Sequence, residues 1–287
     1  MSTPQLIRYQ HPDKGAQVAV VVDDTVYDIP DLTIEAWLRL SVGRVEEAID
    51  ELIDLIQSIK GQKLETIHYL PPIDSQEVWA AGVTYMKSRE ARQEEAEDGG
   101  DVYARVYAAE RPEIFFKAAL KNTVGHGDEV GIREDSQWNV PEPELGVVLN
   151  PAMEVVGFTV GNDMSSRDIE GANPLYLPQA KVYSASCALG TGIVLAPSDE
   201  FPDTTIRISI VRNGSEAFAD AIHTSRIKRT ISALVSYLGR SNTFPNGVIL
   251  LTGTGIVPPS DFTLQAGDVV TITIDDIGTL QNTVKVV

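Results

Sequence analysis

The spacing of short apolar runs constrains the fold of this chain more than any other feature. After residue 72, β-branched and aromatic residues gather in runs that alternate with glycine-rich turns: Ile114–Phe116, Leu145–Leu149, Val155–Val160, Ile206–Val211, Val248–Leu251 and Val269–Ile274. Such runs are typical of strands in a roll, barrel or sandwich, and not of a doubly wound sheet. Helical patterns interrupt them at residues 85–97, 102–109 and 227–238, the last capped by Thr224-Ser225. The expected class is therefore α+β.

The first 70 residues have a different pattern. A hairpin, two helices and a linker are predicted in turn, over residues 18–29, 32–40, 45–59 and 69–72. The hairpin is expected to turn at Asp23-Asp24, and the linker contains Pro71-Pro72, which interrupts regular structure. We therefore expect a small α/β domain over residues 1–70 and a larger β-rich domain over residues 71–287.

Charge and cysteine content exclude several partners. The net charge of −18, without a cluster of lysine and arginine, argues against nucleic acid. The sequence shows neither a run long enough to span a membrane nor an apolar signal segment, so we expect a cytoplasmic protein without a membrane partner. The single cysteine, Cys187, excludes an internal disulfide and a cysteine-rich zinc site. Its small apolar neighbours favour a buried inert thiol over a nucleophile.

Three carboxylates carry the clearest chemical signal. Glu142 and Glu144 are two residues apart at the start of an apolar run, so in a strand both project from one face. Asp163 ends the next apolar run, and a hairpin of the two runs would place it beside the pair. Most Glu-x-Glu pairs are solvated surface residues, but the apolar flanks and the third carboxylate favour a metal site. An all-oxygen ligand set fits Mg²⁺ best, with Mn²⁺ and Ca²⁺ as alternatives.

At these residues the chain resembles the fumarylacetoacetate hydrolase superfamily, over about residues 78–287. The shared motifs are Glu-x-Glu, Asn-Asp-x-Ser-x-Arg-Asp, Pro-x-x-Phe-x-Lys and a Thr-Gly-Thr turn, here at residues 142–144, 162–168, 112–117 and 252–254. The resemblance implies a mixed β-roll or barrel catalytic domain behind the small N-terminal α/β domain. It also implies that Glu142, Glu144 and Asp163 bind the metal, that Arg167 and Asp168 are supports, and that Thr254 helps to hold a substrate carboxylate.

One departure from the family pattern bears on the reaction. Family members that hydrolyse carbon–carbon bonds usually carry a water-activating histidine where this chain has Ser88, and serine accepts no proton near neutral pH. Residues 84–89, 111–113 and 173–181 instead resemble the branch of 2-keto-3-deoxy-pentonate dehydratases. That resemblance implies magnesium-dependent dehydration of a 2-oxo sugar acid to 2,5-dioxopentanoate by a homodimer or homotetramer. A 2-oxo acid decarboxylase, an acylpyruvate hydrolase and a metal-binding protein without activity are the alternatives.

Candidate roles follow for the polar residues of these motifs. Lys181 is the candidate base, with a pKa lowered by burial beside a metal; its alternative role is a permanent cation for the substrate carboxylate. Glu113, before an apolar strand, is the candidate acid with a raised pKa; its alternative is a structural salt bridge. Thr84, Ser88 and Arg89 are candidates to contact substrate hydroxyls. The acidic segment 89–101 is expected to be either a mobile lid or a solvated helix.

Overall fold

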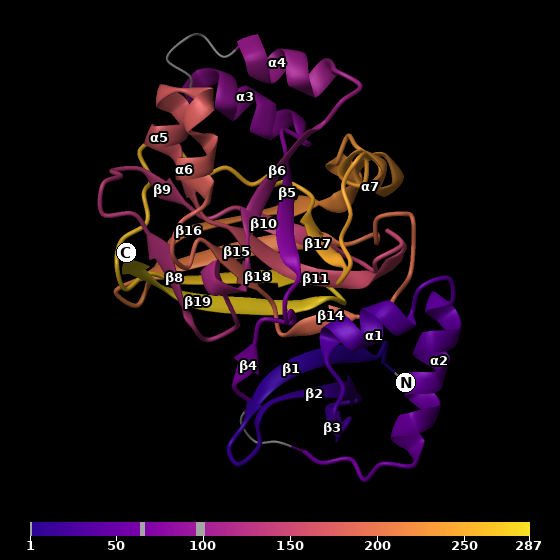
Figure 1. Cartoon of the computed structure of the whole chain (residues 1–287). Coiled ribbons are helices and arrows are strands. Elements are labelled where there is room, and N and C mark those ends of the chain that lie inside the picture. Colours follow the sequence, from indigo (N-terminus) through magenta and orange to yellow (C-terminus); the bar gives the residue numbers. More distant parts are fainter. Residues whose placement is uncertain (1, 64–66, 96–100) are drawn as a thin grey trace.

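The computed structural model describes residues 2–63, 67–95 and 101–287, and two open sheets form the centre of the fold (Figure 1). The larger sheet has twelve strands, nine of them in the order β3-β2-β1-β14-β11-β10-β17-β5-β6. The bounds of its strands are β1 (Gln5–His11), β2 (Gly15–Val22), β3 (Thr25–Asp28), β4 (Tyr69–Leu70), β5 (Glu77–Gly82), β6 (Glu113–Ala118), β7 (Thr123–Val124), β10 (Pro143–Leu149), β11 (Val155–Asp163), β13 (Cys187–Leu189), β14 (Gly192–Val194) and β17 (Val248–Leu251).

The second sheet has five strands in the order β16-β15-β18-β19-β8, and a short two-stranded sheet pairs β9 with β12. The bounds of these strands are β8 (Glu129–Ile132), β9 (Asn139–Val140), β12 (Ser165–Ser166), β15 (Thr205–Arg212), β16 (Ser215–His223), β18 (Val269–Ile274) and β19 (Gly278–Val286). The expected mixed α+β class is confirmed. Among the described residues neither strand order closes into a ring, so the sheets form no closed barrel.

Helices lie at the ends and on the outer faces of the sheets (Figure 1). Their bounds are α1 (Ile34–Leu40), α2 (Val45–Gln57), α3 (Met86–Glu95), α4 (Asp101–Ala108), α5 (Arg167–Ala172), α6 (Leu177–Lys181) and α7 (Ile231–Leu238), with 3₁₀ turns η1 (Leu120–Asn122), η2 (Pro174–Tyr176) and η3 (Thr224–Arg226). None of the described helices is both long and apolar enough to span a membrane. Part of the segment expected to form a lid or a solvated helix, residues 96–100, lies outside the described residues.

The central strands are buried on both faces, which explains their continuous apolar runs. In β10, Val147 belongs to the core between the two sheets, with Ile208 and Ile272. Its neighbour Val148 points the other way, into a core that it shares with Trp37 of α1. Every residue of β10 and β11 is buried. The hairpin that these strands form is therefore a rigid frame for the side chains at its end.

Local structure confirms some predicted elements and corrects others. The hairpin turn at Asp23-Asp24 is confirmed, with φ of 47° and 58° at the two residues. The helix predicted from residue 227 begins at Ile231, because Thr230 caps it and residues 224–226 form a 3₁₀ turn. Residues 69–70 of the predicted linker pair with β1 as β4. The predicted domain boundary at residue 70 stays a prediction. Strand β1, which precedes that boundary, pairs with β14, which follows it.

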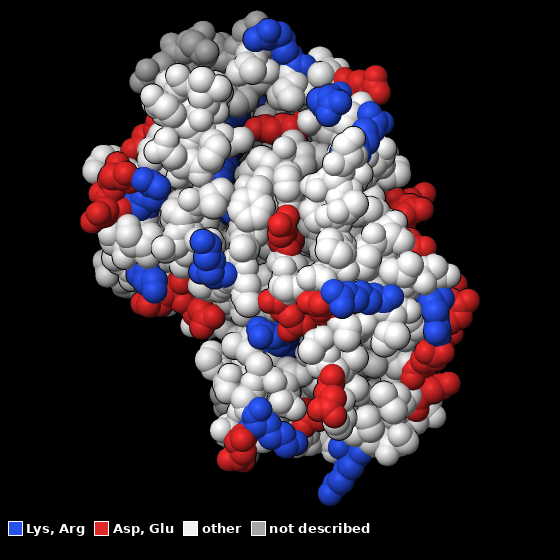
Figure 2. Space-filling model, in the orientation of Figure 1, with Lys and Arg blue, Asp and Glu red and all other residues white. Residues whose placement is uncertain are grey.

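Charged side chains are mixed on the surface. On the face shown in Figure 2, lysine and arginine side chains are scattered among acidic ones and form no continuous basic patch.

Candidate active site

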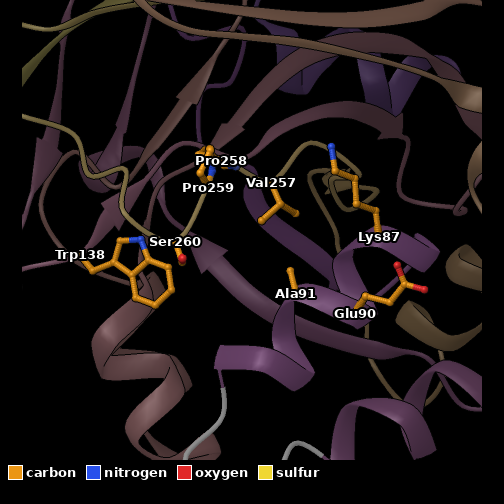
Figure 3. A pocket seen from close by; sticks show the side chains of 8 residues that line it. All are labelled: Lys87, Glu90, Ala91, Trp138, Val257, Pro258, Pro259 and Ser260. Atoms are coloured by element: carbon orange, nitrogen blue, oxygen red, sulfur yellow. The ribbon is translucent and has the colours of Figure 1, made fainter.

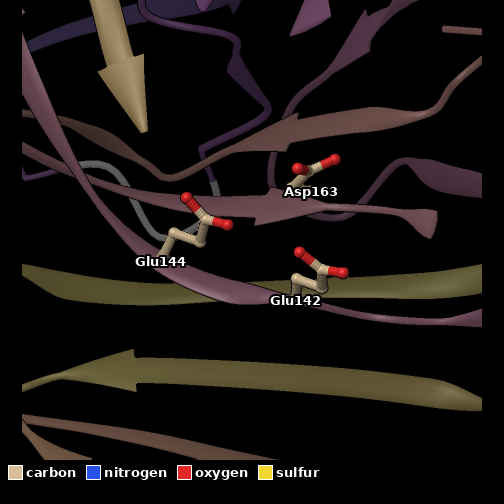
Figure 4. Close-up of side chains that lie close together, drawn as sticks. All are labelled: Glu142, Glu144 and Asp163. Carbon is tan, nitrogen blue, oxygen red and sulfur yellow. The ribbon is translucent and has the colours of Figure 1, made fainter. Parts of the chain in front are cut away.

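Three carboxylates meet at the end of the β10–β11 hairpin. Glu142 directly precedes β10, Glu144 lies in it, and Asp163 is the last residue of β11. The antiparallel register pairs Pro143 with Asn162 and Glu144 with Gly161, so the predicted hairpin is confirmed. One oxygen of each carboxylate lies within 4.8 Å of the others, and all three residues are buried (Figure 4). The strand β17 pairs with β10 only from Gly146 onwards, which leaves Pro143 at an opening of the sheet.

This cluster has the properties of a divalent cation site. Glu144 Oε2 accepts a hydrogen bond from Gly253 N at 2.6 Å. Burial, together with the charges of Asp163 and Glu142, raises the pKa of Glu144 well above its ordinary value. A bound divalent cation would offset that repulsion, and three carboxylate oxygens are a ligand set that Mg²⁺ prefers. The residues present therefore fit the metal that the sequence predicts.

Cationic side chains surround Glu142. Its Oε1 atom lies 3.0 Å from Arg92 Nη2 and 2.9 Å from Arg167 Nη2, and it accepts a hydrogen bond from Ser165 Oγ at 2.9 Å. Its Oε2 atom lies 2.9 Å from Lys181 Nζ. Burial alone would raise the pKa of Glu142, but these cations outweigh it and hold the pKa below the usual range. Glu142 is thus a permanent anion in the site.

Two buried lysines hold Asp163. Lys117 Nζ lies 2.5 Å from Asp163 Oδ1 and donates a hydrogen bond to Met164 O at 2.8 Å. Lys181 Nζ lies 3.1 Å from Asp163 Oδ2 and donates to Ser165 Oγ at 2.6 Å. Burial lowers the pKa of Lys181, but the charges of Asp163 and Glu142 outweigh it, so that the pKa is raised. The protein's own charges thus raise the pKa of Lys181, and the lowered pKa predicted beside a bound metal stays a prediction.

Glu113 is the group in this site whose proton affinity suits acid chemistry. The residue is partly buried and lines a small cavity together with Glu142, Asp163 and Glu170. Burial first, and then the charge of Glu170, raises the pKa of Glu113 to about 7. The predicted raised pKa is confirmed, and the carboxyl group is partly protonated at neutral pH. Its role as the acid stays a prediction.

These groups enclose a small cavity of about 10 Å³. Its lining includes four predicted site residues outside the metal triad, namely Ser88, Glu113, Lys181 and Thr254, and no described histidine. Two other predicted residues do not line it. Thr84 donates a hydrogen bond to Thr252 O at 2.7 Å, and the guanidinium of Arg89 lies 5.4 Å from the centre of the Tyr107 ring. Their predicted contacts with substrate hydroxyls stay predictions.

Two lining residues were not predicted from the sequence. Arg92 forms ion pairs with Glu142 and with Glu170, which are on different elements. Arg92 follows Ser88 by four residues in α3, so helical spacing would have placed both on one face. Glu170 follows Arg167 by three residues in α5, and the same argument applies. Burial raises the pKa of Glu170, but Arg92 and other cations outweigh it and lower the pKa.

The expected supports lie behind the site. Arg167 is fully buried and contacts Glu142, as described above. Asp168 accepts hydrogen bonds from Ser136 Oγ at 2.6 Å and Gln137 N at 2.7 Å, which hold the segment that leads to Glu142. Val83, beside the cavity, has a φ of 52°, an uncommon value for a β-branched residue. Such strain is concentrated at functional sites.

A larger pocket lies on a different face of α3. It has a volume of about 540 Å³, and Lys87 and Ala91 of α3 face Trp138 and residues 257–260 across it (Figure 3). It is larger than the carboxylate cavity, but its described lining carries one acidic residue, Glu90, whose side chain is more than half exposed. The acid–base groups gather in the small cavity, so the chemistry belongs there.

Fold and site together define a metal-dependent enzyme, and comparison with known proteins gives its family. The C-terminal domain model of fumarylacetoacetate hydrolase matches residues 77–285. A probable 2-keto-3-deoxyxylonate dehydratase of Haloferax volcanii is 46% identical over 277 residues, which cover 92% of this chain and 94% of that protein. The chain belongs to the fumarylacetoacetate hydrolase family, and the predicted resemblance is confirmed.

Two further relatives cover almost the whole chain. The 2-dehydro-3-deoxy-D-arabinonate dehydratase of Saccharolobus solfataricus is 41% identical over 273 residues, covering 93% of this chain and 91% of that protein. A solved structure of 2-keto-3-deoxy-D-arabinonate dehydratase, complexed with magnesium and 2,5-dioxopentanoate, matches with a TM-score of 0.81 at 35% identity over 99% of both chains. The fold expected from the resemblance is thereby confirmed.

Proposed function

We propose that this protein catalyses the magnesium-dependent dehydration of a 2-keto-3-deoxy-pentonate to 2,5-dioxopentanoate. The observation that carries the proposal is a buried triad of carboxylates beside a cavity that Glu113 also lines. Similarity over nearly the full length to dehydratases of such acids supports the reaction class. The absence of a described histidine from the cavity lining disfavours hydrolysis through a histidine-activated water.

The reaction removes a proton from C3 and the hydroxyl group from C4, which leave together as water and give a 3,4-unsaturated 2-oxo acid that keeps its C5 hydroxyl. A proton then leaves C5 and another is added at C3, which gives the C4–C5 enol. The enol becomes the C5 aldehyde when the proton of its hydroxyl is lost and C4 gains a proton. When bound at the triad, magnesium supplies a Lewis acid that acidifies the C3 protons of a 2-oxo acid. The protonated form of Glu113 gives its proton to the departing C4 hydroxyl. Lys181 lines the same cavity, where it either takes the C3 proton as the base or holds the substrate carboxylate as a permanent cation. Ser88 and Thr254 line the same cavity and are placed to bind substrate oxygens.

Mass spectrometry of the reaction tests the proposal. The purified protein is incubated with racemic 2-keto-3-deoxy-pentonate, with magnesium and again with excess chelator. We expect magnesium-dependent loss of one water and formation of 2,5-dioxopentanoate. Carbon dioxide release from oxaloacetate, or cleavage of an acylpyruvate, without loss of water from the pentonate would contradict the proposal and favour a decarboxylase or hydrolase.

A carboxylate variant tests the metal site within the same assay. Glu142→Gln removes one ligand charge while keeping the shape of the side chain, so we expect magnesium-dependent turnover to fall by a factor of about 10² or more. Glu134→Gln, at an exposed position, is the matched control and should keep normal activity. Near-normal turnover in Glu142→Gln, with circular dichroism showing an intact fold, would contradict the metal assignment.

We further infer a cytoplasmic homodimer or homotetramer, which the family resemblance supports. Light scattering coupled to size-exclusion chromatography tests the assembly. A mass equal to a single chain of 31.2 kDa would contradict it.

A further inference from the structure

The two oxygens of Glu142 have different partners, and so do those of Asp163. Glu142 Oε1 is held by Arg92, Arg167 and Ser165 from three different elements. Asp163 Oδ1 is held by Lys117, a fully buried residue of β6. The surrounding frame therefore fixes one oxygen of each carboxylate. The second oxygens, Glu142 Oε2 and Asp163 Oδ2, are both held by the ammonium group of one residue.

That residue is Lys181, and its ammonium group lies between the two carboxylates. Lys181 Nζ lies 2.9 Å from Glu142 Oε2 and 3.1 Å from Asp163 Oδ2. Magnesium binds carboxylate oxygens at about 2.0–2.1 Å. An ion that bound these same two oxygens would lie within a few ångströms of the ammonium, and like charges that close repel strongly inside a protein.

The backbone of Lys181 is held in place, whereas its side chain can move. Lys117 Nζ donates a hydrogen bond to Lys181 O at 2.5 Å, and Lys181 is the last residue of α6. The side chain has four rotatable carbon–carbon bonds and borders the cavity that Ser88 and Thr254 also line. An ammonium released from the two carboxylates therefore has that cavity to move into without any shift of the main chain.

We propose that Lys181 and the divalent cation compete for the same two carboxylate oxygens. Lys181 neutralises Glu142 and Asp163 when no divalent ion is bound, and it thereby weakens the affinity of the site for the metal. Metal binding displaces the ammonium from both oxygens and turns it toward the cavity. The inference rests on the metal site of the proposed function but not on the reaction, because both of its tests are made without substrate.

The first test measures metal affinity in variants. Mn²⁺ binding is measured from the electron paramagnetic resonance signal of the free ion. Mg²⁺ affinity is measured from the ability of Mg²⁺ to displace bound Mn²⁺. Lys181→Met should bind Mn²⁺ about tenfold more tightly than the natural chain, the size of a typical coupling between two sites. Lys181→Arg keeps a cation and should stay near the natural affinity. Lys87→Met, which removes a half-exposed cation paired with Asp220, is the matched control and should not change it.

Equal or weaker Mn²⁺ binding by Lys181→Met would overturn the proposal, because it would make Lys181 an organiser of the ligands and not their competitor. Failure of the natural chain to bind either ion would overturn it as well.

If Lys181→Met does not fold, nitrogen NMR of ¹⁵N-lysine-labelled natural protein decides. Adding Mg²⁺ to chelator-treated protein should shift the Lys181 Nζ resonance, assigned through Lys181→Arg. The Nζ of Lys285, paired at the surface with Glu129, should not move. An unmoved Lys181 resonance would contradict displacement.

Discussion

At the scale of single residues, the site is a cluster of opposite charges with very little solvent. Four carboxyl groups line the cavity, namely Glu113, Glu142, Asp163 and Glu170, and Glu144 lies close to Glu142 and Asp163. Four cations contact members of this group, namely Arg92, Lys117, Arg167 and Lys181. Burial first, and then the charge of Glu170, brings the pKa of Glu113 to about 7, so this group should contribute a limb to the pH dependence of the enzyme.

We expect kcat to fall as the pH rises through about 7, because Glu113 is then deprotonated and no longer gives a proton to the leaving hydroxyl. Below that pH Glu113 is protonated, so its titration should not change kcat there. Glu113→Gln should lower kcat by a factor of about 10²–10⁴ and remove this limb of the profile. Steady-state rates measured from pH 5 to 9 check both statements.

Glu110→Gln is the control for that experiment. Glu110 is an exposed carboxylate that accepts a hydrogen bond from Tyr237 Oη at 2.9 Å, away from the cavity. The pH profile of kcat in Glu110→Gln should match that of the natural chain. A Glu113→Gln enzyme that kept the limb near pH 7 would show that another group is the acid.

The residues that the sequence identified, and those it did not, differ in a physical way. Glu142, Glu144 and Asp163 were predictable because strand periodicity and a single hairpin bring them together. Lys181 was found only through the family resemblance. Its ammonium group lies between two carboxylates, and no sequence pattern contains those distances. Arg92 was missed because α3 was interpreted as an exposed acidic helix, although one of its faces is buried.

At the scale of elements, the site depends on a parallel pairing between distant strands. Strand β17 pairs in parallel with β5, with Leu251 opposite Ala80. The chain leaving β17 therefore runs beside the chain leaving β5. Thr84 Oγ1 donates to Thr252 O, and Gly253 N donates to Glu144 Oε2. The turn after β17 thus connects the cavity wall to a metal ligand.

Gly253→Ala should damage this turn. Gly253 has a φ of 89°, and a methyl group there would overlap Thr84 Oγ1 and lie 2.8 Å from Ala81 O. We expect a loss of about 2–4 kcal/mol in the free energy of unfolding, from backbone strain and steric overlap together. We also expect weaker Mn²⁺ binding, because the hydrogen bond to Glu144 is disturbed.

Gly267→Ala provides the comparison, since Gly267 has a φ of 88° and nothing lies within 4 Å of the position of an added methyl group. Gly267→Ala should lower the free energy of unfolding by the backbone strain alone, about 1–2 kcal/mol, and should leave the metal affinity unchanged. Urea denaturation gives the stabilities. Equal effects of the two substitutions on metal affinity would mean that the turn does not support Glu144.

Element boundaries were harder to predict than elements. The start of α7 was predicted at residue 227, but the helix begins four residues later, at Ile231. Lys228 and Arg229 occupy the intervening segment and donate to main-chain carbonyls at Tyr107, Val106 and Glu110. These tertiary contacts hold the segment outside the helix, and they involve residues more than 100 positions away.

At the scale of the whole molecule, the first 70 residues and the remainder share a sheet and a core. Strand β1 pairs with β14 from Gln5–Val194 to Ile7–Gly192. Trp37 and Leu52 of the first segment belong to one apolar cluster with Val148, Val156 and Ile249. The composition predicted two regions of different character, but it did not predict that their strands would join, because strand pairing depends on long-range packing.

Removal of residues 1–70 tests whether the remainder is independent. We expect the fragment 71–287 to be insoluble or to unfold at a temperature well below that of the full chain, because β14 loses its neighbour and part of the core is exposed. Expression yield and thermal unfolding followed by circular dichroism measure this. A soluble fragment with the unfolding temperature of the full chain would show that the N-terminal segment is dispensable for folding.

The position of β17 has a consequence for the synthesis of the protein. It lies between β10 and β5, but the chain must grow about 100 residues beyond Leu149 before Val248 is made. At a translation rate of roughly 5–20 residues per second, the edge of β10 waits about 5–20 s for its partner, and the edge of β5, which is made earlier, waits longer. During this interval two apolar strand edges of the nascent chain are free to pair wrongly. Chaperones that shield the growing chain should therefore matter more for its yield than the stability of the finished protein would suggest.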